Sequence, residues 1–196
     1  MGGATTLSQA AQRLIPLEQG KLDNLCGLYA ILNAVRLASW PVLEHRHFTS
    51  RRLFHEGIAF LDQEGLLAET LRTGMAERTW RKLCRAVIAE ANRMGDEELG
   101  HMPLLAKPGG ADLATVIAEL QHHTEQSRPV LIALHGGYNH YTVIVEVRDH
   151  RLILFDSFGY HWVSLDACEL DRGRRRKHGK RHRLSHRGAM VICRPP

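Results

Sequence analysis

The fold of this chain is decided by the segment QGKLDNLCGLYAILNA at residues 19–34. Apolar side chains recur in it at the spacing of one helix face, and Asp23 or Asn24 can cap the helix N-terminus. We therefore expect a helix that runs to about Leu37. Cys26 falls in the first turn of this helix, and Gln19 lies seven residues before the cysteine. The segment thus supplies a core helix and a candidate nucleophile together.

The apolar pattern changes its period halfway along the chain. Helical spacing in the first half predicts further helices at residues 50–61, 75–94 and 112–121, with a loop at 95–110. Short β-rich runs in the second half predict strands at residues 129–134, 141–147, 151–155 and 188–193. Helices followed by antiparallel strands indicate the α+β class. A length of 196 residues suits one buried core, so we expect a single domain over residues 1–196, with residues 1–17 as a candidate flexible N-terminus.

The composition is ordinary for a soluble globular protein, with 44% hydrophobic and 24% charged residues. No apolar run approaches the roughly 18 residues of a membrane span. Residues 1–17 lack both the basic and the apolar region of a secretory signal, so we expect no signal peptide.

The cysteines favour a reducing compartment, because they show no Cys-x-x-Cys spacing and do not form a disulfide pattern. They are Cys26, Cys84, Cys168 and Cys193. No histidine lies at zinc-ligand spacing from any of them, so we expect neither a metal nor another cofactor.

The net charge of +5 conceals a strong asymmetry. Residues 171–187 contain nine Lys or Arg and one Asp, whereas the rest of the chain has 17 basic and 20 acidic residues. The basic residues of this segment are Arg172, Arg174, Arg175, Arg176, Lys177, Lys180, Arg181, Arg183 and Arg187. We expect a basic loop between strands, which could bind an acidic protein or nucleic acid, or serve only as a solvated hairpin connection. The segment has no interleaved aromatic residues on which bases would stack.

Cys26 is the best placed of the four cysteines for nucleophilic chemistry. A free thiol has a pKa near 8.5, and a helix N-terminus or an adjacent imidazolium favours the reactive thiolate. Gly27 would let a substrate carbonyl approach the helix N-terminus. The alternative is a small buried core residue, which suits Cys84 and Cys193 better, whereas Cys168 is undecided.

A predicted hairpin brings a base and its orienting group together. If Val147 pairs with Arg151 around a three-residue turn, Thr142 lies opposite Asp156 and His140 is the diagonal neighbour of that carboxylate. Diagonal positions are about 7–8 Å apart, which is within reach of a carboxylate–imidazole hydrogen bond. Asp156 could therefore hold one ring nitrogen of His140 and leave the other for a thiol.

Three further residues are weighed against this pair. His135 and His161 are rival bases, but neither shares the hairpin geometry. Gln19 could donate an amide N–H to a developing oxyanion beside the Cys26 backbone amide.

These motifs resemble the papain-like cysteine peptidase superfamily. They are Gln19, DNLCGLYA at residues 23–30, NHY at 139–141 and FDSFG at 155–159, and the resemblance covers roughly residues 18–193. Their compact order looks most like bacterial peptidases that cleave double-glycine leader peptides, and like papain-fold toxins and effectors. Asp156 in place of Asn, and the lack of a Trp after Gly27, set the chain apart from papain itself. The resemblance implies a papain-like fold: a helical lobe holds Cys26 against an antiparallel sheet that holds His140 and Asp156.

We therefore expect a cysteine hydrolase that cleaves a peptide or isopeptide amide through Cys26, His140, Asp156 and Gln19. One alternative is a papain-fold effector that deamidates glutamine or transfers an acyl group. Another is a catalytically idle module that binds an anionic partner through its basic loop. The expected compartment is the cytoplasm, or the cytoplasm of a target cell if the protein is delivered as an effector.

Overall fold

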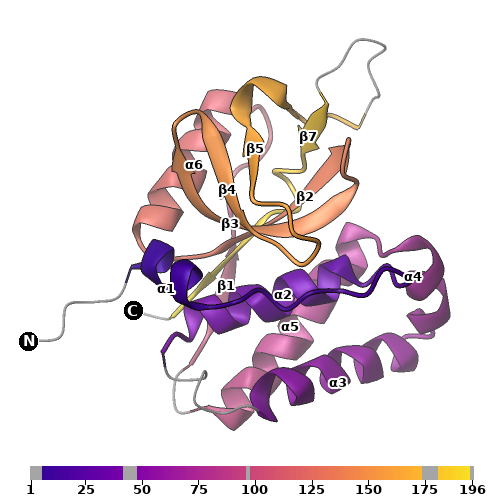
Figure 1. Cartoon of the computed structure of the whole chain (residues 1–196). Helices are drawn as coiled ribbons and strands as arrows, with labels where there is room; N and C mark the ends of the chain where they lie inside the picture. The colour runs from indigo at the N-terminus through magenta and orange to yellow at the C-terminus, as the bar shows by residue number, and fades with distance from the viewer. Residues whose placement is uncertain (1–5, 42–47, 96–97, 174–180, 195–196) are drawn as a thin grey trace, which may run out of the picture.

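The computed structural model describes residues 6–41, 48–95, 98–173 and 181–194 (Figure 1). The helices in these residues are α1 (Leu7–Arg13), α2 (Cys26–Ala38), α3 (Phe48–Gln63), α4 (Leu67–Thr73), α5 (Glu77–Met94), α6 (Leu113–Glu125) and the 3-10 turn η1 (Leu165–Ala167). The strands are β1 (Gly100–Pro103), β2 (Val130–Gly136), β3 (His140–Arg148), β4 (Arg151–Phe155), β5 (Trp162–Ser164), β6 (Cys168–Leu170), β7 (His182–Leu184) and β8 (Met190–Cys193).

The strands form one sheet with the order β1-β8-β2-β3-β4-β5, in which all neighbours are antiparallel. β7 pairs antiparallel with the last residues of β2 and parallel with β6. The predicted α+β class is therefore confirmed, with the helices concentrated in the first half of the chain.

Helices cover both faces of the sheet. In β2, Leu131 and Ala133 belong to the core beneath α1 and α2, whereas Val130, Ile132 and Leu134 belong to the core beneath α6. A strand that is buried on both faces reads as a continuous apolar run, as the sequence of β2 does. Figure 1 shows α2 lying between the sheet and α3 and α5. This arrangement places the N-terminus of α2 beside the ends of β2 and β3.

The start of α2 differs in detail from the predicted cap. Leu25 is the N-cap residue and offers no side-chain hydrogen bond. The Asp23 carboxylate instead accepts from the backbone N–H groups of Leu25 and Gly20, each at 3.0 Å. Asp23 therefore orders the loop that leads into the helix rather than capping the helix directly.

Part of the candidate flexible N-terminus forms helix α1. Thr6 and Gln9 form a capping box for α1, and Leu7, Ala10 and Leu14 are buried. The helix is only seven residues long, so its periodicity is too short to be recognised from the sequence. Of the candidate flexible N-terminus, residues 1–5 lie outside the described part of the chain.

The turn between β3 and β4 has two residues rather than the predicted three. Asp149 and His150 both have positive φ, 49° and 57°, as a type I′ turn requires. Val147 consequently pairs with Leu152 and not with Arg151. The turn was missed because Asp-His is an unusual pair for these backbone angles, which Asn-Gly normally supplies.

A β-bulge corrects the register before the strands reach their far end. The register shifts between Ile144 and Glu146, and beyond the shift Val143 pairs with Phe155. Continued by one residue, this register places Asp156 opposite Thr142. The predicted alignment is thus obtained near the site through a shorter turn and one extra residue in β3.

The basic segment at residues 171–187 is not a simple loop. It contains β7, which pairs parallel with β6, so these two strands do not form a hairpin. The basic residues Arg174, Arg175, Arg176, Lys177 and Lys180 lie outside the described residues, whereas Arg172, Arg181, Arg183 and Arg187 lie within them.

Candidate active site

Cys26 is the first residue of α2 and is half-buried. Its side chain lines a cleft of about 120 Å³ at the junction between the helices and the sheet. The cleft is lined by Asn24, Cys26, Thr73, Gly74, Met75, Ala133, His135, Asn139, His140 and Tyr141. The structure therefore brings Cys26 and His140, which are 114 residues apart in sequence, into one cavity.

His140 and Asp156 form a buried hydrogen-bonded pair. His140 Nε2 lies 2.8 Å from Asp156 Oδ2, and the two residues are 7% and 3% exposed. The other carboxylate oxygen, Oδ1, accepts from the backbone N–H groups of Phe158 at 2.8 Å and Tyr160 at 3.3 Å. The loop after β4 thus fixes the carboxylate, and the carboxylate fixes the ring.

Electrostatics in this pair favour a charged imidazole. Burial opposes protonation of His140, but hydrogen bonds to Asp156 and to the Cys26 side chain raise its pKa to about 9. Burial likewise opposes ionisation of Asp156, yet its hydrogen bond to His140 holds the carboxyl pKa below the ordinary value. The pair is therefore an imidazolium–carboxylate pair at neutral pH.

Gln19 is joined through its backbone to the segment that follows Asp156. Its backbone N–H donates to the carbonyl oxygen of Ser157 at 3.0 Å, next to Asp156. Its side-chain Oε1 is buried and has no hydrogen-bond partner among the described residues. Gln19 does not line the cleft with Cys26 and His140. The structure thus holds the backbone of Gln19 beside the residue that follows Asp156.

The two rival histidines differ in their surroundings. His135 lines the cleft, but its Nε2 lies 3.1 Å from Glu77 Oε1 and 3.7 Å from Asp171 Oδ2. The hydrogen bond to Glu77 raises the pKa of His135, so this ring is committed to an ion pair. His161 is exposed and does not line the cleft.

The other cysteines occupy different environments. Cys84 is fully buried in α5, and burial raises its pKa to about 12. Burial also raises the pKa of Cys168 to about 11. Cys193, at the end of β8, is half-buried and far along the chain from the cleft residues.

Two aromatic residues, Trp80 of α5 and Tyr141 of β3, hold the cleft together. Trp80 Nε1 donates to the carbonyl oxygen of Gly27 at 2.9 Å, and the Tyr141 hydroxyl donates to the carbonyl oxygen of Met75 at 2.8 Å. The two rings lie 4.2 Å apart. They link α5 and its preceding loop to the start of α2 and to β3. The apolar stripe of α5 predicts a buried Trp80, but its hydrogen bond becomes evident only in the structure.

Gly27 serves packing rather than substrate access. A Cβ atom at this position would lie 3.0 Å from Trp80 Cδ1 and 3.1 Å from Met75 Sδ. The Cβ position of Gly27 is therefore filled by protein. The missing side chain lets α5 pack closely against the helix N-terminus.

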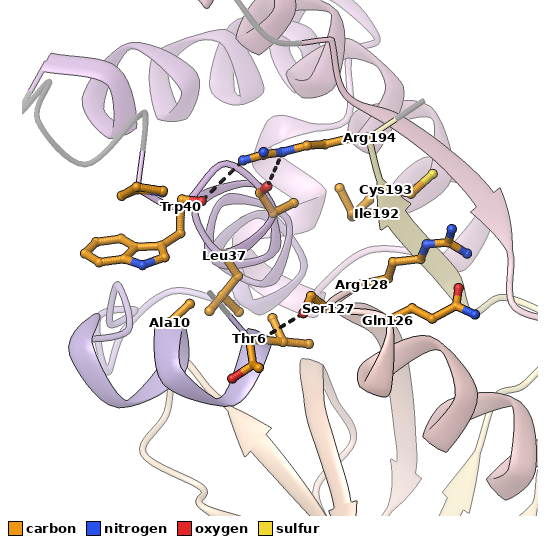
Figure 2. Close-up of a pocket in the computed structure, with 13 residues that line it drawn as sticks. Thr6, Ala10, Leu37, Trp40, Gln126, Ser127, Arg128, Ile192, Cys193 and Arg194 are labelled. Atoms are coloured by element: carbon orange, nitrogen blue, oxygen red, sulfur yellow. Dashed lines mark hydrogen bonds between the residues drawn. The ribbon is translucent and has the colours of Figure 1, made fainter. Parts of the chain in front are cut away.

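A larger cavity of about 460 Å³ lies at the opposite end of α2. Figure 2 shows Leu37 of α2, Thr6 and Ala10 of the N-terminal segment, and Ser127 around it. The thirteen residues of α2 place the two cavities about 18 Å apart along the helix axis. Cys193 lines the larger cavity, but none of its described lining residues is His, Asp or Glu. It offers no base for a thiol.

Among the described residues, no group of three or more His, Cys, Asp or Glu side chains could hold a metal ion. Nor does the described part of the chain contain a helix long and apolar enough to cross a membrane. No family model, curated protein or solved structure matches the chain.

Proposed function

We propose that this protein is a cysteine hydrolase that cleaves a peptide or isopeptide amide bond. One observation carries the proposal. Cys26, at the N-terminus of α2, shares a cleft with a buried His140 whose Nε2 is held 2.8 Å from Asp156 Oδ2. The second ring nitrogen of His140 is then available to the thiol. A papain-like mechanism follows from these positions.

In the first half-reaction, the Cys26 thiolate, paired with the protonated His140, attacks the substrate carbonyl carbon. A carbon–sulfur bond forms while the carbonyl π electrons move to oxygen. When the tetrahedral intermediate collapses, the carbon–nitrogen bond breaks and His140 protonates the departing amine. The helix N-terminus and the nearby imidazolium both favour the thiolate.

In the second half-reaction, His140 removes a proton from water as the oxygen attacks the thioester carbon. The carbon–sulfur bond breaks, which releases the carboxylic acid and restores Cys26. Asp156 keeps the imidazole oriented and stabilises its charge through both steps. No other reactant is required.

The oxyanion would be held by the Cys26 backbone N–H and the Gln19 side-chain amide. The first N–H groups of a helix have no intrahelical acceptor, so that of Cys26 is available. The backbone hydrogen bond from Gln19 to Ser157, the residue after Asp156, supports its part in this site. Loss of one such donor typically costs about 2.7–4 kcal/mol of transition-state stabilisation.

The proposal is tested by thiol labelling combined with a search for cleavage. Limited iodoacetamide treatment near pH 6.5, followed by mass spectrometry, should modify Cys26 before the other three cysteines. Cys193 is the matched control, since it is also half-buried.

Incubation with a peptide library should generate new amino termini, and Cys26→Ala should abolish them. Faster labelling of Cys193, or cleavage that survives in Cys26→Ala, would contradict the proposal. Release of ammonia without new amino termini would identify a deamidase instead.

A further inference from the structure

An aromatic and basic surface adjoins the candidate active site. We define this surface, the Arg181 platform, by Tyr138, Phe158, Tyr160 and Arg181. Tyr138 lies in the turn between β2 and β3, Phe158 and Tyr160 follow Asp156, and Arg181 directly precedes β7. The four residues come from three separate segments, so only the tertiary structure assembles them.

Ring contacts connect the platform to His140. The Tyr160 ring meets the His140 ring edge-on at 5.6 Å, and Phe158 meets it edge-on at 6.2 Å. Tyr138 stacks on Tyr160 at 3.9 Å with an interplanar angle of 4°, and the Arg181 guanidinium lies 5.9 Å from the Tyr138 centroid. Arg181 is therefore two rings away from the proposed base.

Two glycines fix Arg181 in this place. The Gly137 backbone N–H donates to the Arg181 carbonyl oxygen at 2.6 Å. A Cβ at Gly136, whose φ is +90°, would lie 2.6 Å from that same oxygen, and one at Gly137 would lie 2.7 Å from Arg181 Cγ. No larger residue could occupy either position without moving Arg181. The close approach anchors the end of the basic segment beside the cleft.

The exposed side chains of the Arg181 platform are positively charged and apolar. Arg181 is exposed, and Phe158 is 51% exposed although it is a large apolar side chain. Two acidic groups of the neighbouring segments have other partners: Asp156 is buried against His140, and Asp171 contacts Arg183 and His135. The arginine charge therefore faces solvent without a described acidic partner beside it.

We propose that the Arg181 platform binds an acidic segment of a polypeptide substrate, with an apolar side chain on Phe158 and a carboxylate on Arg181. This inference rests on the proposed function of the cleft, because it names the class of substrate that the cleft receives. A polypeptide fits better than nucleic acid. Base stacking needs open ring faces. One face of Tyr138 is covered by Tyr160, and His182 packs against Tyr138 at 4.3 Å.

The experiment measures binding without turnover, by fluorescence anisotropy on the Cys26→Ala protein. The probes are a labelled 12-residue peptide of Glu and Leu, the same peptide with Gln for every Glu, and a labelled 12-nucleotide single-stranded DNA. We expect the acidic peptide to bind about tenfold more tightly than the Gln peptide, and Arg181→Gln to remove most of that difference. Phe158→Ala should weaken both peptides. Arg51→Gln, an exposed arginine on α3, is the matched control and should change neither.

Equal affinity for the two peptides, tighter binding of the DNA, or equal effects of Arg181→Gln and Arg51→Gln would each overturn the inference. Failure of the proposed function has a different signature. In that case the acidic peptide binds through Arg181, but the wild-type protein never cleaves it or any other peptide.

Discussion

At the scale of single residues, the imidazole of His140 links stability to pH. Its pKa is raised from 6.5 to about 9, because the hydrogen bonds to Asp156 and Cys26 outweigh burial. A group with a raised folded-state pKa stabilises the protein fully below its unfolded pKa and loses that contribution as pH rises through the folded pKa. We therefore expect the free energy of unfolding to fall between about pH 6.5 and 9, by at most about 3 kcal/mol from this residue.

Urea unfolding at pH 6, 7.5 and 9 measures this decline. The slope should become shallower in His140→Gln. His135→Gln is an informative control, because Glu77 raises the pKa of His135. His135 should therefore also contribute a decline in unfolding free energy as pH rises, but a smaller one than His140. An unchanged slope in His140→Gln would show that His140 is not protonated through this pH range.

The proposed catalytic residues should differ in how much activity remains after each is substituted. Cys26→Ala and His140→Ala should lower activity by about 10³-fold or more while preserving the fold. Asp156→Asn should retain a small residual activity, because an amide can still orient the ring. The measurement is the initial rate of amide cleavage, with circular dichroism as the check on folding.

His135→Ala and His161→Ala are the matched controls for the choice of base. Both should keep far more activity than His140→Ala, since His135 is paired with Glu77 and His161 lies outside the cleft. Full activity in His140→Ala, with loss in either control, would identify the wrong histidine. In an idle binding module none of these changes would alter partner binding.

At the scale of elements, the contact between α5 and α2 sets the position of Cys26. The Trp80 indole N–H donates to the Gly27 carbonyl oxygen inside the core. Trp80→Phe removes this hydrogen bond and part of a fully buried ring, which should together cost about 1–3 kcal/mol of unfolding free energy. Urea titration measures the loss. Labelling of Cys26 should also slow, because the helix N-terminus is no longer held against α5.

Trp162→Phe is the matched control, because Trp162 is 46% exposed and stacks only against Arg151 at the surface. Its effect on unfolding should stay within about 0.5 kcal/mol. If both tryptophan variants lose equal stability, the hydrogen bond to Gly27 does not carry the effect.

The β3–β4 hairpin shows how far local sequence can lead. Alternating apolar residues predicted both strands, and the strand ends agree within one residue. The turn was wrong because two non-glycine residues adopt positive φ at positions where glycine is usual. The bulge near Val145 compensates for the wrong turn length, and nothing in the local sequence pattern predicts this bulge. The predicted alignment of Thr142 with Asp156 was therefore correct, although the predicted length of the turn was not.

At the scale of the whole molecule, positive charge is concentrated in one segment of the chain. The segment 171–187 has a balance of +8 against −3 for the remainder. Replacing Arg174, Arg175, Arg176, Lys177 and Lys180 by Ser keeps the length of the crossover between β6 and β7. Shortening it to a tight turn is not a neutral change, because parallel strands need a crossover connection.

The serine variant should fold normally and cleave a small uncharged substrate at the wild-type rate. Its affinity for an acidic peptide should drop, and the dependence of that affinity on salt should become shallower. Anisotropy titrations at 50 and 200 mM NaCl measure both. Unchanged affinity with no salt dependence would mean that these charges are only solvated.

The sequence by itself determined the α+β class, the helix that begins at Cys26 and the identity of the residues proposed for catalysis. Each of these depends on local periodicity or on residues close together in the chain. Tertiary structure alone decided that Gly27 packs against Trp80, that the Gln19 backbone bonds to Ser157, and that Arg181 lies above Tyr138. These contacts join segments separated by dozens of residues, and burial of shared apolar surface, rather than local preference, selects them.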